Sequence, residues 1–557
     1  MNPAFSTVAM VLVSALMAPA QIAIRGPYLQ QAGPERMTVR WRGGETAGRV
    51  RFGTNPAALD RGADEAAAPA SPFDHAVVLT GLAPATTYFY NIGDAGGVSA
   101  ASADFHFTTP PQAGAAARVR VWVLGDAGTA DVFQEQTRDG FRAWAGSQPP
   151  DLVLQLGDNA YWAGEDGEFQ AALFQMYQPE LCHLPFWSCL GNHDIDNTPA
   201  DGREFPYFQI YSFPTAGECG GTASGTERFF SFDSGNVHFV SLDSTLSDRS
   251  ATGSMAAWLQ RDLAATTATW LIAFFHHAPY TKGSHDSDTE IGLVEMRANL
   301  LPILEAGGVD LVLSGHSHCY ERSVLLDGHY GPSNTLAAAM IKNGGDGRAT
   351  GTGSYRKPLT GPRGRRGTVY CVAGSAGMTS GGTLNHPVHR VALNTLGSLG
   401  IDISGTRLDA TFVTNTGVAA DTFTILKEDA PDSDLDKIPD GYETLHGLDP
   451  QNPATALQDA DGDGTDNLSE YVFGRPASVA DRYVVEVTRQ SGPAATKVTF
   501  PSVPERVYQV WWSETLQAGD WYAGSPQMAG TGGTLAWVDD GPAGARRFYR
   551  VQAMVMP

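Results

Sequence analysis

The sequence predicts a multidomain protein in which an N-terminal β-sandwich, a central α/β domain, an acidic spacer and a small C-terminal β-domain follow one another. Three observations support this. The chain has 557 residues, whereas one domain usually holds roughly 50–200. The apolar pattern changes near residue 118 from short alternating runs to long continuous ones. Beyond residue 428 the composition turns acidic.

The first 20 residues have the pattern of a secretory signal peptide cleaved before Gln21. An apolar run from Val8 to Ala20 ends in Ala18-Pro19-Ala20, although no Lys or Arg precedes it. A buried N-terminal helix is the alternative. The run is too short to span a bilayer, and no later apolar stretch is long enough. We therefore expect a secreted, periplasmic or cell-surface protein without a transmembrane span.

The charge balance argues against nucleic acid as a partner. The chain has 37 Lys and Arg against 60 Asp and Glu, a net charge of −23, which repels phosphate backbones over most of the surface. An anionic substrate would need a local positive centre, and a metal cluster would supply one. The five cysteines are an odd number, so in an oxidising compartment at least one stays free or pairs outside the chain. Cys182 and Cys189 are close enough to bridge, Cys219 competes, and the connectivity stays open.

Residues 21–111 alternate short β-patterned runs with turns. No helical period interrupts them, and strands at this spacing are typical of a β-sandwich. Pro110-Pro111 and the Ala/Gly-rich stretch after them indicate a linker. The runs are "MTVRW" (37–41), "HAVVLTGL" (75–82), "TTYFYNIG" (86–93) and "FHFTT" (105–109).

Residues 117–427 contain five long apolar runs, each of which stops in a polar or glycine-containing cluster. Continuous apolar strands belong to sheets covered on both faces, and ligands of such sheets bind beyond the strand ends. The five polar clusters are therefore expected to line one crevice. The runs are "VRVWVLGD" (119–126), "DLVLQLGD" (151–158), "FWSCLGNHD" (186–194), "TWLIAFFHH" (269–277) and "VDLVLSGHSH" (309–318).

The clusters offer the donors that a two-metal site requires. Such a site needs about three or four protein ligands per ion, one bridging carboxylate, and open positions for water and phosphate. Each donor alone is weak evidence for a metal site, because a histidine at a strand end is usually a hydrogen-bonded core residue. The order and placement of the donors together favour the site. The donors are Asp126, Asp158, Asn192, His193, His276, His316 and His318.

The order of these clusters resembles the calcineurin-like metallophosphoesterases, specifically the purple acid phosphatase branch. The order is GDxG, GDxxY, GNHD, a strand ending in His, and GHxHxYER; "WLIAFFH" (270–276) and "GHSHCYERS" (315–323) are similar to the family's versions. The N-terminal domain, with "GPYLQ" (26–30) and "GLAPATTYFY" (81–90), resembles the fibronectin type III-like domain that precedes the family's catalytic domain. The resemblance covers roughly residues 25 to 425 and implies a central β-sandwich flanked by helices.

The resemblance implies the metal ligands. Asp158 would bridge the two ions. Tyr161 would favour Fe(III), because a phenolate is a hard, charged oxygen donor; ordinary aromatic packing is the alternative. The second ion would be divalent Fe, Zn or Mn. One set is Asp126, Asp158, Tyr161 and His318, and the other is Asp158, Asn192, His276 and His316. A one-residue shift would replace His276 by His277.

The resemblance also implies the activity. His193 and His285 match histidines that contact substrate and protonate the leaving group. The expected function is an exported, acid phosphatase-like hydrolase that cleaves phosphate monoesters by attack of a metal-bound hydroxide. One alternative is a phosphodiesterase of the same fold. Another is a surface-binding protein whose phosphatase-like domain is inactive.

Residues 428–478 contain two acidic stretches with the spacing of EF-hand-type calcium loops. "DSDLDKIPDGYE" (432–443) and "DADGDGTDNLSE" (459–470) place acids at positions 1, 3, 5 and 12. Lys437 replaces the usual Gly at position 6 of the first, and a disordered acidic linker is the alternative. The segment resembles bacterial thrombospondin type 3-like repeats, which implies a calcium-stiffened spacer. The expected calcium ligands are Asp432, Asp434, Asp436, Asp440, Glu443, Asp459, Asp461, Asp463 and Glu470.

Residues 481–557 carry aromatic-rich β-patterned runs, which predict a small β-domain. The aromatics could form a face that contacts glycans or the cell surface, or a small core, and the core interpretation is favoured. The runs are "YQVWWSE" (508–514), "TLAWVDD" (534–540) and "RRFYRVQA" (546–553).

Overall fold

The computed structural model describes ten stretches of the chain, and the predicted signal peptide (1–20) lies outside them. No helix in these stretches is long and apolar enough to cross a membrane. All five cysteines are buried free thiols. The stretches are residues 25–66, 74–196, 205–348, 350–358, 366–427, 432–489, 495–503, 506–531, 533–541 and 546–555.

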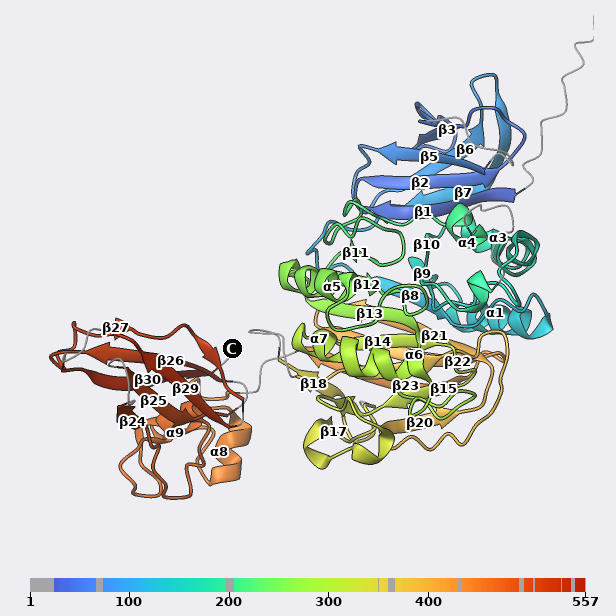
Figure 1. Ribbon diagram of the computed structural model, residues 1–557. Helices are drawn as coiled ribbons and strands as arrows, with labels where there is room; N and C mark the ends of the chain where they lie inside the picture. Colours follow the sequence, from blue (N-terminus) through green and yellow to red (C-terminus); the bar gives the residue numbers. More distant parts are fainter. Residues whose placement is uncertain are drawn as a thin grey trace, which may run out of the picture.

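The N-terminal domain consists of two antiparallel sheets (Figure 1). Buried residues from both sheets, among them Met37, Trp41, Val50 and Tyr90, belong to one hydrophobic cluster. One sheet has the order β1 (Arg25–Gly33), β2 (Arg36–Arg42), β5 (Asp74–Thr80). The other has the order β4 (Arg61–Asp64), β3 (Arg49–Gly53), β6 (Thr87–Gly93), β7 (Val98–Thr108).

The central domain contains two seven-stranded sheets. In the first, β8, β9 and β10 run parallel, while β21 to β23 form an antiparallel extension. Its order is β10 (Phe186–Ser188), β9 (Leu152–Gln155), β8 (Val119–Leu124), β21 (Gly397–Ser404), β22 (Arg407–Thr414), β23 (Ala419–Lys427), β18 (Tyr355–Lys357).

The second sheet has a parallel core, β12-β13-β14-β19, with antiparallel strands on both sides. Its order is β11 (Phe230–Ser234), β12 (Val237–Ser241), β13 (Trp270–His277), β14 (Leu311–Gly315), β19 (Val369–Ala373), β15 (Tyr320–Ser323), β20 (His389–Leu393). A two-stranded ribbon joins β16 (Leu325–Leu326) to β17 (Ile341–Asn343).

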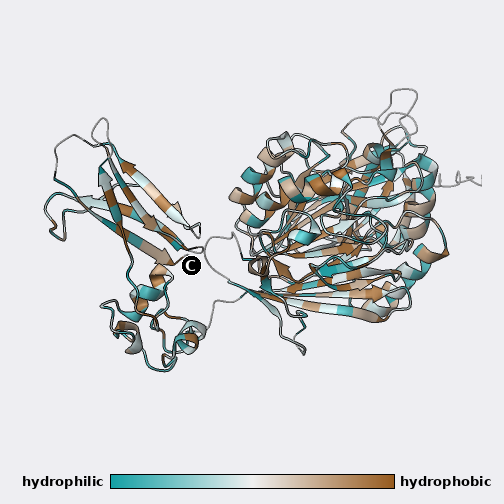
Figure 2. Ribbon diagram, turned by 60° about the horizontal axis from the view of Figure 1, so that its bottom comes forward, coloured by the Kyte–Doolittle hydropathy of each residue, from teal (hydrophilic) through white to brown (hydrophobic). Residues whose placement is uncertain are grey.

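Alternate residues of β13 explain why this strand is apolar throughout. Ile272 and Phe274 lie in the cluster that also holds residues of the first sheet, whereas Leu271 and Phe275 lie in a second cluster beneath helices. A strand covered on both faces needs apolar residues at every position. Figure 2 shows hydrophobic residues concentrated in the central strands.

Helices cover the outer faces of the two sheets (Figure 1). On the first sheet, α1 begins after Asp131, whose side chain accepts hydrogen bonds from the N–H groups of Phe133 and Gln134. The helices are α1 (Val132–Ala145), α2 (Asp166–Phe169), α3 (Met176–Leu181), α4 (Pro206–Ile210), α5 (Ser254–Ala265), α6 (Ile291–Glu295) and α7 (Leu301–Ala306). One-turn π segments join α2 to α3 (Gln170–Gln175) and α6 to α7 (Met296–Leu300), and short 3-10 turns are His193–Ile195, Ser333–Thr335, Ala338–Met340 and Thr455–Leu457.

The spacer and the C-terminal domain stand apart from the rest (Figure 1). The spacer holds α8 (Asp440–His446) and α9 (Asn467–Phe473). Val498, Phe500, Tyr508 and Val510 form the buried centre of the small β-domain. Its sheets are β24 (Glu486–Arg489), β25 (Thr496–Pro501), β29 (Thr534–Asp539), and β27 (Tyr522–Ala523), β26 (Arg506–Ser513), β28 (Met528–Ala529), with β30 (Phe548–Val555) also pairing β26.

Candidate metal centre

Three of the predicted metal ligands occupy the left-handed backbone region. Asp126 follows β8 with φ 55°, Asp158 follows β9 with φ 53°, and His316 follows β14 with φ 66°. This region costs a non-glycine residue roughly 1–2 kcal/mol. Such backbone strain persists where the surrounding structure enforces it, and it concentrates at functional sites.

The hydroxyl of Tyr161 lies among three other predicted ligands. Tyr161 Oη is 3.2 Å from Asp126 Oδ1, 3.0 Å from Asp158 Oδ2 and 3.2 Å from His318 Nε2. Burial, together with the charges of the two aspartates, raises the pKa of Tyr161 well above its ordinary value. The phenol therefore stays protonated unless a strong cation sits among these atoms.

A second group of predicted ligands surrounds His276. Its Nε2 is 3.0 Å from Asn192 Oδ1, 3.1 Å from His316 Nδ1 and 3.4 Å from Asp158 Oδ1. The other ring nitrogen, Nδ1, is 2.8 Å from the carbonyl oxygen of Leu156, which holds Nε2 toward the group. Burial disfavours the charged imidazolium, but Asp158 outweighs this and raises the pKa of His276 to about 10.

Asp158 belongs to both groups. The donor atoms of Asp126, Asp158 and His318 lie within 4.8 Å of one another, as do those of Asp158, His276 and His316. Oxygen and imidazole donors of this kind suit Fe, Zn or Mn ions. Two adjacent groups that share one carboxylate fit a pair of metal ions.

His277 points to a different set of neighbours. Its Nδ1 is 2.8 Å from Ser244 Oγ, and its backbone N–H donates to the same oxygen. With Glu290 and His316 it forms another trio, which shares His316 with the group around His276 and whose donor atoms also lie within 4.8 Å of one another. The structure brings His276 to Asp158 and His277 to this trio.

Residues 119–320 match the family model of the calcineurin-like phosphoesterases. Residues 24–109 match that of the purple acid phosphatase N-terminal domain. The chain contains a calcineurin-like phosphoesterase domain. The expected N-terminal β-domain ahead of a metallophosphoesterase domain is therefore confirmed.

Individual relatives agree with these matches. The chain is 30% identical over 284 residues to purple acid phosphatase 15 and 31% identical over 284 residues to purple acid phosphatase 23, both of Arabidopsis thaliana. These matches cover 45% and 44% of this chain and 49% and 57% of the relatives, so the chain spans about half of their length. The structure of purple acid phosphatase PPD1 from yellow lupin (Lupinus luteus) seeds shares the fold with a TM-score of 0.56 and 19% identity, over 73% of this chain and 75% of that one.

The two predicted catalytic histidines of the phosphoesterase domain are partly exposed beside the buried ligands. The ring of His193 lies 4.8 Å from that of Tyr161, and its Nδ1 is 2.8 Å from the carbonyl oxygen of Trp162 and 3.0 Å from Asp196 Oδ2. The ring of His285 lies 3.7 Å from that of His316. Their side chains are 26% and 32% exposed, so both stand on the open side of the centre.

Two acidic residues next to the predicted metal ligands were not predicted from the sequence. Asp194 is fully buried and accepts hydrogen bonds from the N–H groups of Asp158 (3.1 Å), Asn159 (2.8 Å) and Gly191 (2.9 Å). Its place in the GNHD cluster could have drawn attention to it. Glu290 lies 2.6 Å from His316 Nε2 and 2.7 Å from His285 Nδ1. It comes from a loop without any local motif.

These two acids differ in their electrostatics. Burial and the charge of Asp158 raise the pKa of Asp194. Burial also acts against the charge of Glu290, but the hydrogen bonds from His285 and His316 hold its pKa well below the ordinary value. Glu290 therefore stays ionised and fixes both imidazoles, as carboxylates often do next to metal-binding histidines.

In each of the two acidic loops of the spacer, a carboxylate accepts hydrogen bonds from backbone N–H groups of the same loop. In the first loop, Asp432 accepts from the N–H groups of Asp436 (3.2 Å) and Lys437 (3.0 Å). In the second, Asp459 accepts from those of Gly462 (2.8 Å) and Gly464 (2.8 Å). The donor atoms of the first three acids of each loop lie within 4.8 Å of one another: Asp432, Asp434 and Asp436, and Asp459, Asp461 and Asp463.

The last acid of each loop is buried with an unsatisfied carboxylate. Both oxygens of Glu470 and Oε2 of Glu443 lack a hydrogen-bond partner, and neither side chain is exposed. Burial and the charge of Asp461 raise the pKa of Glu470 to about 7. Asp440 instead accepts from the N–H (2.7 Å) and hydroxyl (2.6 Å) of Ser433.

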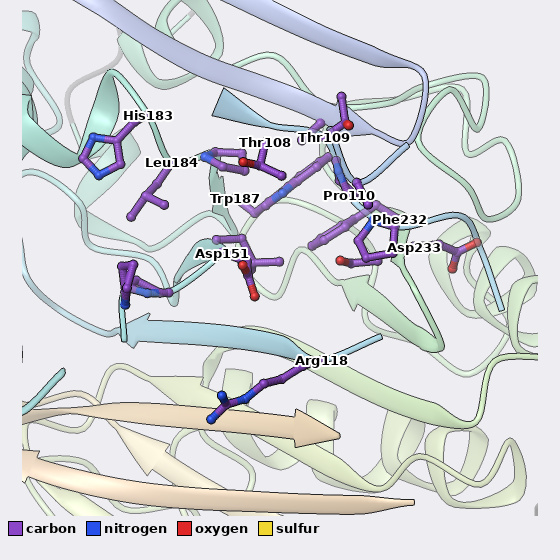
Figure 3. Close-up of a pocket in the computed structure, with 18 of the residues that line it drawn as sticks. Thr108, Thr109, Pro110, Arg118, Asp151, His183, Leu184, Trp187, Phe232 and Asp233 are labelled. Atoms are coloured by element: carbon purple, nitrogen blue, oxygen red, sulfur yellow. The ribbon is translucent and has the colours of Figure 1, made fainter. Parts of the chain in front are cut away.

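A separate cavity of about 310 Å³ lies between the N-terminal and central domains (Figure 3). Its lining includes the stacked rings of Trp187 and Phe232 together with Arg118 and Asp151. None of the predicted metal ligands lines it. The metal centre and this cavity are therefore different sites.

Proposed function

We propose that this protein is an exported, dinuclear metal-dependent phosphatase that hydrolyses phosphate monoesters in the manner of an acid phosphatase. The observation that carries the proposal is the pair of donor groups sharing Asp158 at the strand ends of a calcineurin-like phosphoesterase domain. The relatives named purple acid phosphatase support the same reaction.

The donor set suits two ions of different charge. One ion would be held by Asp126, Asp158, Tyr161 and His318, and the other by Asp158, Asn192, His276 and His316. The bound pair supplies positive charge to the phosphoryl oxygens and a water acidic enough to react near neutral pH. Tyr161 favours Fe(III) in the first position, and divalent Fe, Zn or Mn fits the second.

The chain's own residues position and protonate the ester. Nδ1 of His193 is held by Trp162 and Asp196, and Nδ1 of His285 is held by Glu290. Each ring therefore has Nε2 left for the substrate, and from this atom a proton passes to the departing oxygen. Glu290 keeps the ring of His285 beside that of His316.

The visible absorption spectrum of the mature protein tests the iron assignment. A broad phenolate-to-iron band that disappears in the Tyr161→Phe variant supports Fe(III) at Tyr161. A colourless protein that still hydrolyses phosphoesters would mean that two divalent metal ions occupy the same ligands. The protein would then not belong to the purple acid phosphatase branch.

Substrate comparison separates the proposal from its alternatives. Faster turnover of p-nitrophenyl phosphate than of bis(p-nitrophenyl) phosphate supports a monoesterase, and the reverse order supports a phosphodiesterase. A metal-loaded protein that hydrolyses neither ester supports a surface-binding protein with an inactive domain. N-terminal sequencing of the exported protein tests export, and the expected first residue is Gln21.

The spacer is proposed to bind Ca²⁺ through its two loops. The buried, unsatisfied carboxylates of Glu443 and Glu470 support this, because a buried anion without a partner costs several kcal/mol or becomes protonated. The backbone turns around Asp432 and Asp459 present the loop carboxylates together. Calcium would supply the missing positive charge.

The C-terminal domain is proposed to contact glycans or the cell surface. Trp511 pairs with Arg550 across β26 and β30, and the Arg550 guanidinium lies 4.5 Å from the ring of Trp521. Aromatic rings beside arginine suit sugar rings that carry acidic groups. Lower binding of the Trp521→Ala variant to acidic polysaccharide, compared with the full wild-type chain, tests this.

A further inference from the structure

Trp162 is a large aromatic residue held at the open side of the metal centre. It directly follows Tyr161, and 65% of it is exposed, more than any other tryptophan in the described stretches. Single exposed apolar residues are common on protein surfaces and need no explanation alone. The contacts of Trp162 distinguish it from such residues.

The backbone of Trp162 is fixed on both sides. Its N–H donates to the carboxylate of Glu168, and its carbonyl oxygen accepts from His193 Nδ1 at 2.8 Å. The next N–H, of Ala163, donates to the other carboxylate oxygen of Glu168 at 3.0 Å. The exposure of the indole is therefore set by an anchored backbone and not by a loose loop end.

The indole stands next to the residue that would protonate the leaving group. Its ring lies 5.8 Å from that of His193 in a T-shaped arrangement and 5.1 Å from that of Tyr161. In an in-line displacement the leaving oxygen departs toward its proton donor. The organic part of the ester therefore extends past His193, and Trp162 flanks this path.

The surroundings of Trp162 disfavour a highly charged leaving group. Asp196 lies 3.0 Å from His193 Nδ1, and its side chain is 50% exposed. Glu168 binds the backbone of Trp162 itself. Carboxylates at this side repel further phosphates, whereas the face of an indole attracts a planar uncharged ring.

We propose that Trp162 is a specificity-determining residue that packs against the aromatic leaving group of aryl phosphate monoesters. This rests on the proposed phosphatase function and deepens it by naming a substrate class. The indole contributes to binding of the aryl ring and leaves the metal ligands and the proton donor unchanged. Its effect therefore falls on KM for aryl esters and not on metal content.

Steady-state kinetics of four proteins test the proposal: wild type, Trp162→Ala, Trp162→Phe and the control Trp144→Ala, which removes another exposed tryptophan. The substrates are phenyl phosphate and ethyl phosphate. For Trp162→Ala we expect KM for phenyl phosphate to rise about three- to tenfold, the range of one aromatic contact, with KM for ethyl phosphate within about twofold of wild type. Trp162→Phe restores most of the loss, and Trp144→Ala changes neither value.

A binding measurement without turnover completes the test. Titration with 4-nitrobenzylphosphonate quenches the fluorescence of a tryptophan that the nitroaryl ring contacts, so we expect less quenching in Trp162→Phe at equal metal content. Equal quenching in wild type and Trp162→Phe, or equal KM increases for both esters, would overturn the proposal. A wild-type protein that hydrolyses neither ester would refute the phosphatase function, and the titration would still decide whether Trp162 contacts an aryl ligand.

Discussion

The central domain and the spacer each present a candidate metal site, but they build it in opposite ways. In the central domain the donors come from five strand ends spread between residues 126 and 318, and three of them hold left-handed backbone conformations. In the spacer each site lies within twelve residues, and its carboxylates bond the N–H groups of their own loop. Tertiary packing makes the first site, and local sequence makes the second.

The two regions also balance their charge differently. In the absence of metal ions, Asp158 lies 3.4 Å from His276 and raises the pKa of that imidazole, and the N–H of His316 donates to both oxygens of Asp126 at 3.0 and 2.9 Å. In the spacer, Glu470 is buried with both oxygens unsatisfied. We therefore expect that removal of the cations abolishes catalysis at the centre and lowers the stability of the spacer.

The largest expected effect is that of Asp158→Ala. Asp158 belongs to both donor groups, so the variant should lose metal from both positions, and turnover should fall by more than the roughly 10–100-fold typical of residues that only orient ligands. Metal analysis and phosphatase assays measure this, and thermal unfolding shows whether the fold persists. Asp248→Ala, which removes an exposed carboxylate from the same domain, is the control. Retention of both metals in Asp158→Ala would contradict the shared-carboxylate assignment.

Asp194→Asn should have the next largest effect. The carboxylate accepts three backbone N–H groups from the two loops that carry Asp158 and Asn192, and an amide would present a donor to one of them. We expect metal affinity or turnover to fall about 10–100-fold. Metal titration of the apoprotein separates affinity from turnover. Wild-type affinity in Asp194→Asn would mean that other contacts position these loops.

The order of the strand-end clusters could be predicted because each strand is covered on both faces and reads as a continuous apolar run. The periodicity of the apolar runs did not predict that the strands divide between two sheets. In the structure, β8, β9 and β10 belong to one sheet, and β13 and β14 belong to the other. Only the resemblance implied a sandwich. The predicted donors meet because the carboxyl ends of β8, β9 and β10 in one sheet lie beside those of β13 and β14 in the other.

The choice between His276 and His277 could not be made from residue types. The pairing of β13 with β14 shifts register between Phe275 and His277, so simple alternation does not fix which imidazole faces the centre. Glu290 was also beyond prediction, because a loop 14 residues after His276 carries it and no spacing rule links the two. By contrast, the spacer loops could be proposed as calcium sites from spacing alone, because all their predicted ligands lie within twelve residues of one another.

Calcium removal should separate the spacer from the centre. Chelation with EGTA should lower the stability of the C-terminal part by about 2.7 kcal/mol for each loop when calcium had been present at a hundred times its Kd. Glu470→Gln should lose the part of this calcium response that belongs to the second loop, whereas Asp449→Asn, outside both loops, should keep the whole response. Thermal unfolding with and without Ca²⁺ measures the shift. A stability that is independent of calcium would mean that the loops hold their shape without a cation.

The smallest expected effect concerns a buried charge cluster that contains its own cation. His238 Nδ1 is 2.6 Å from Asp233 Oδ1 and its Nε2 is 2.9 Å from Asp262 Oδ2. Burial disfavours the imidazolium, but the hydrogen bonds to both aspartates raise the pKa of His238 to about 9. A cluster of this kind should respond to pH and be indifferent to chelators.

The sign of the pH response follows from the direction of the shift. Because the folded pKa lies above the unfolded value of about 6.5, the stabilisation is complete below pH 6.5 and is lost as the pH rises through about 9. Between pH 6.5 and pH 8 this group alone should lower the free energy of unfolding by about 1.5 kcal/mol. Denaturant unfolding of wild type and His238→Gln, both in excess EDTA, measures it. The same pH slope in the two proteins would show that His238 is not charged in the folded state, and the contrast between self-balanced and cation-dependent sites would then fail.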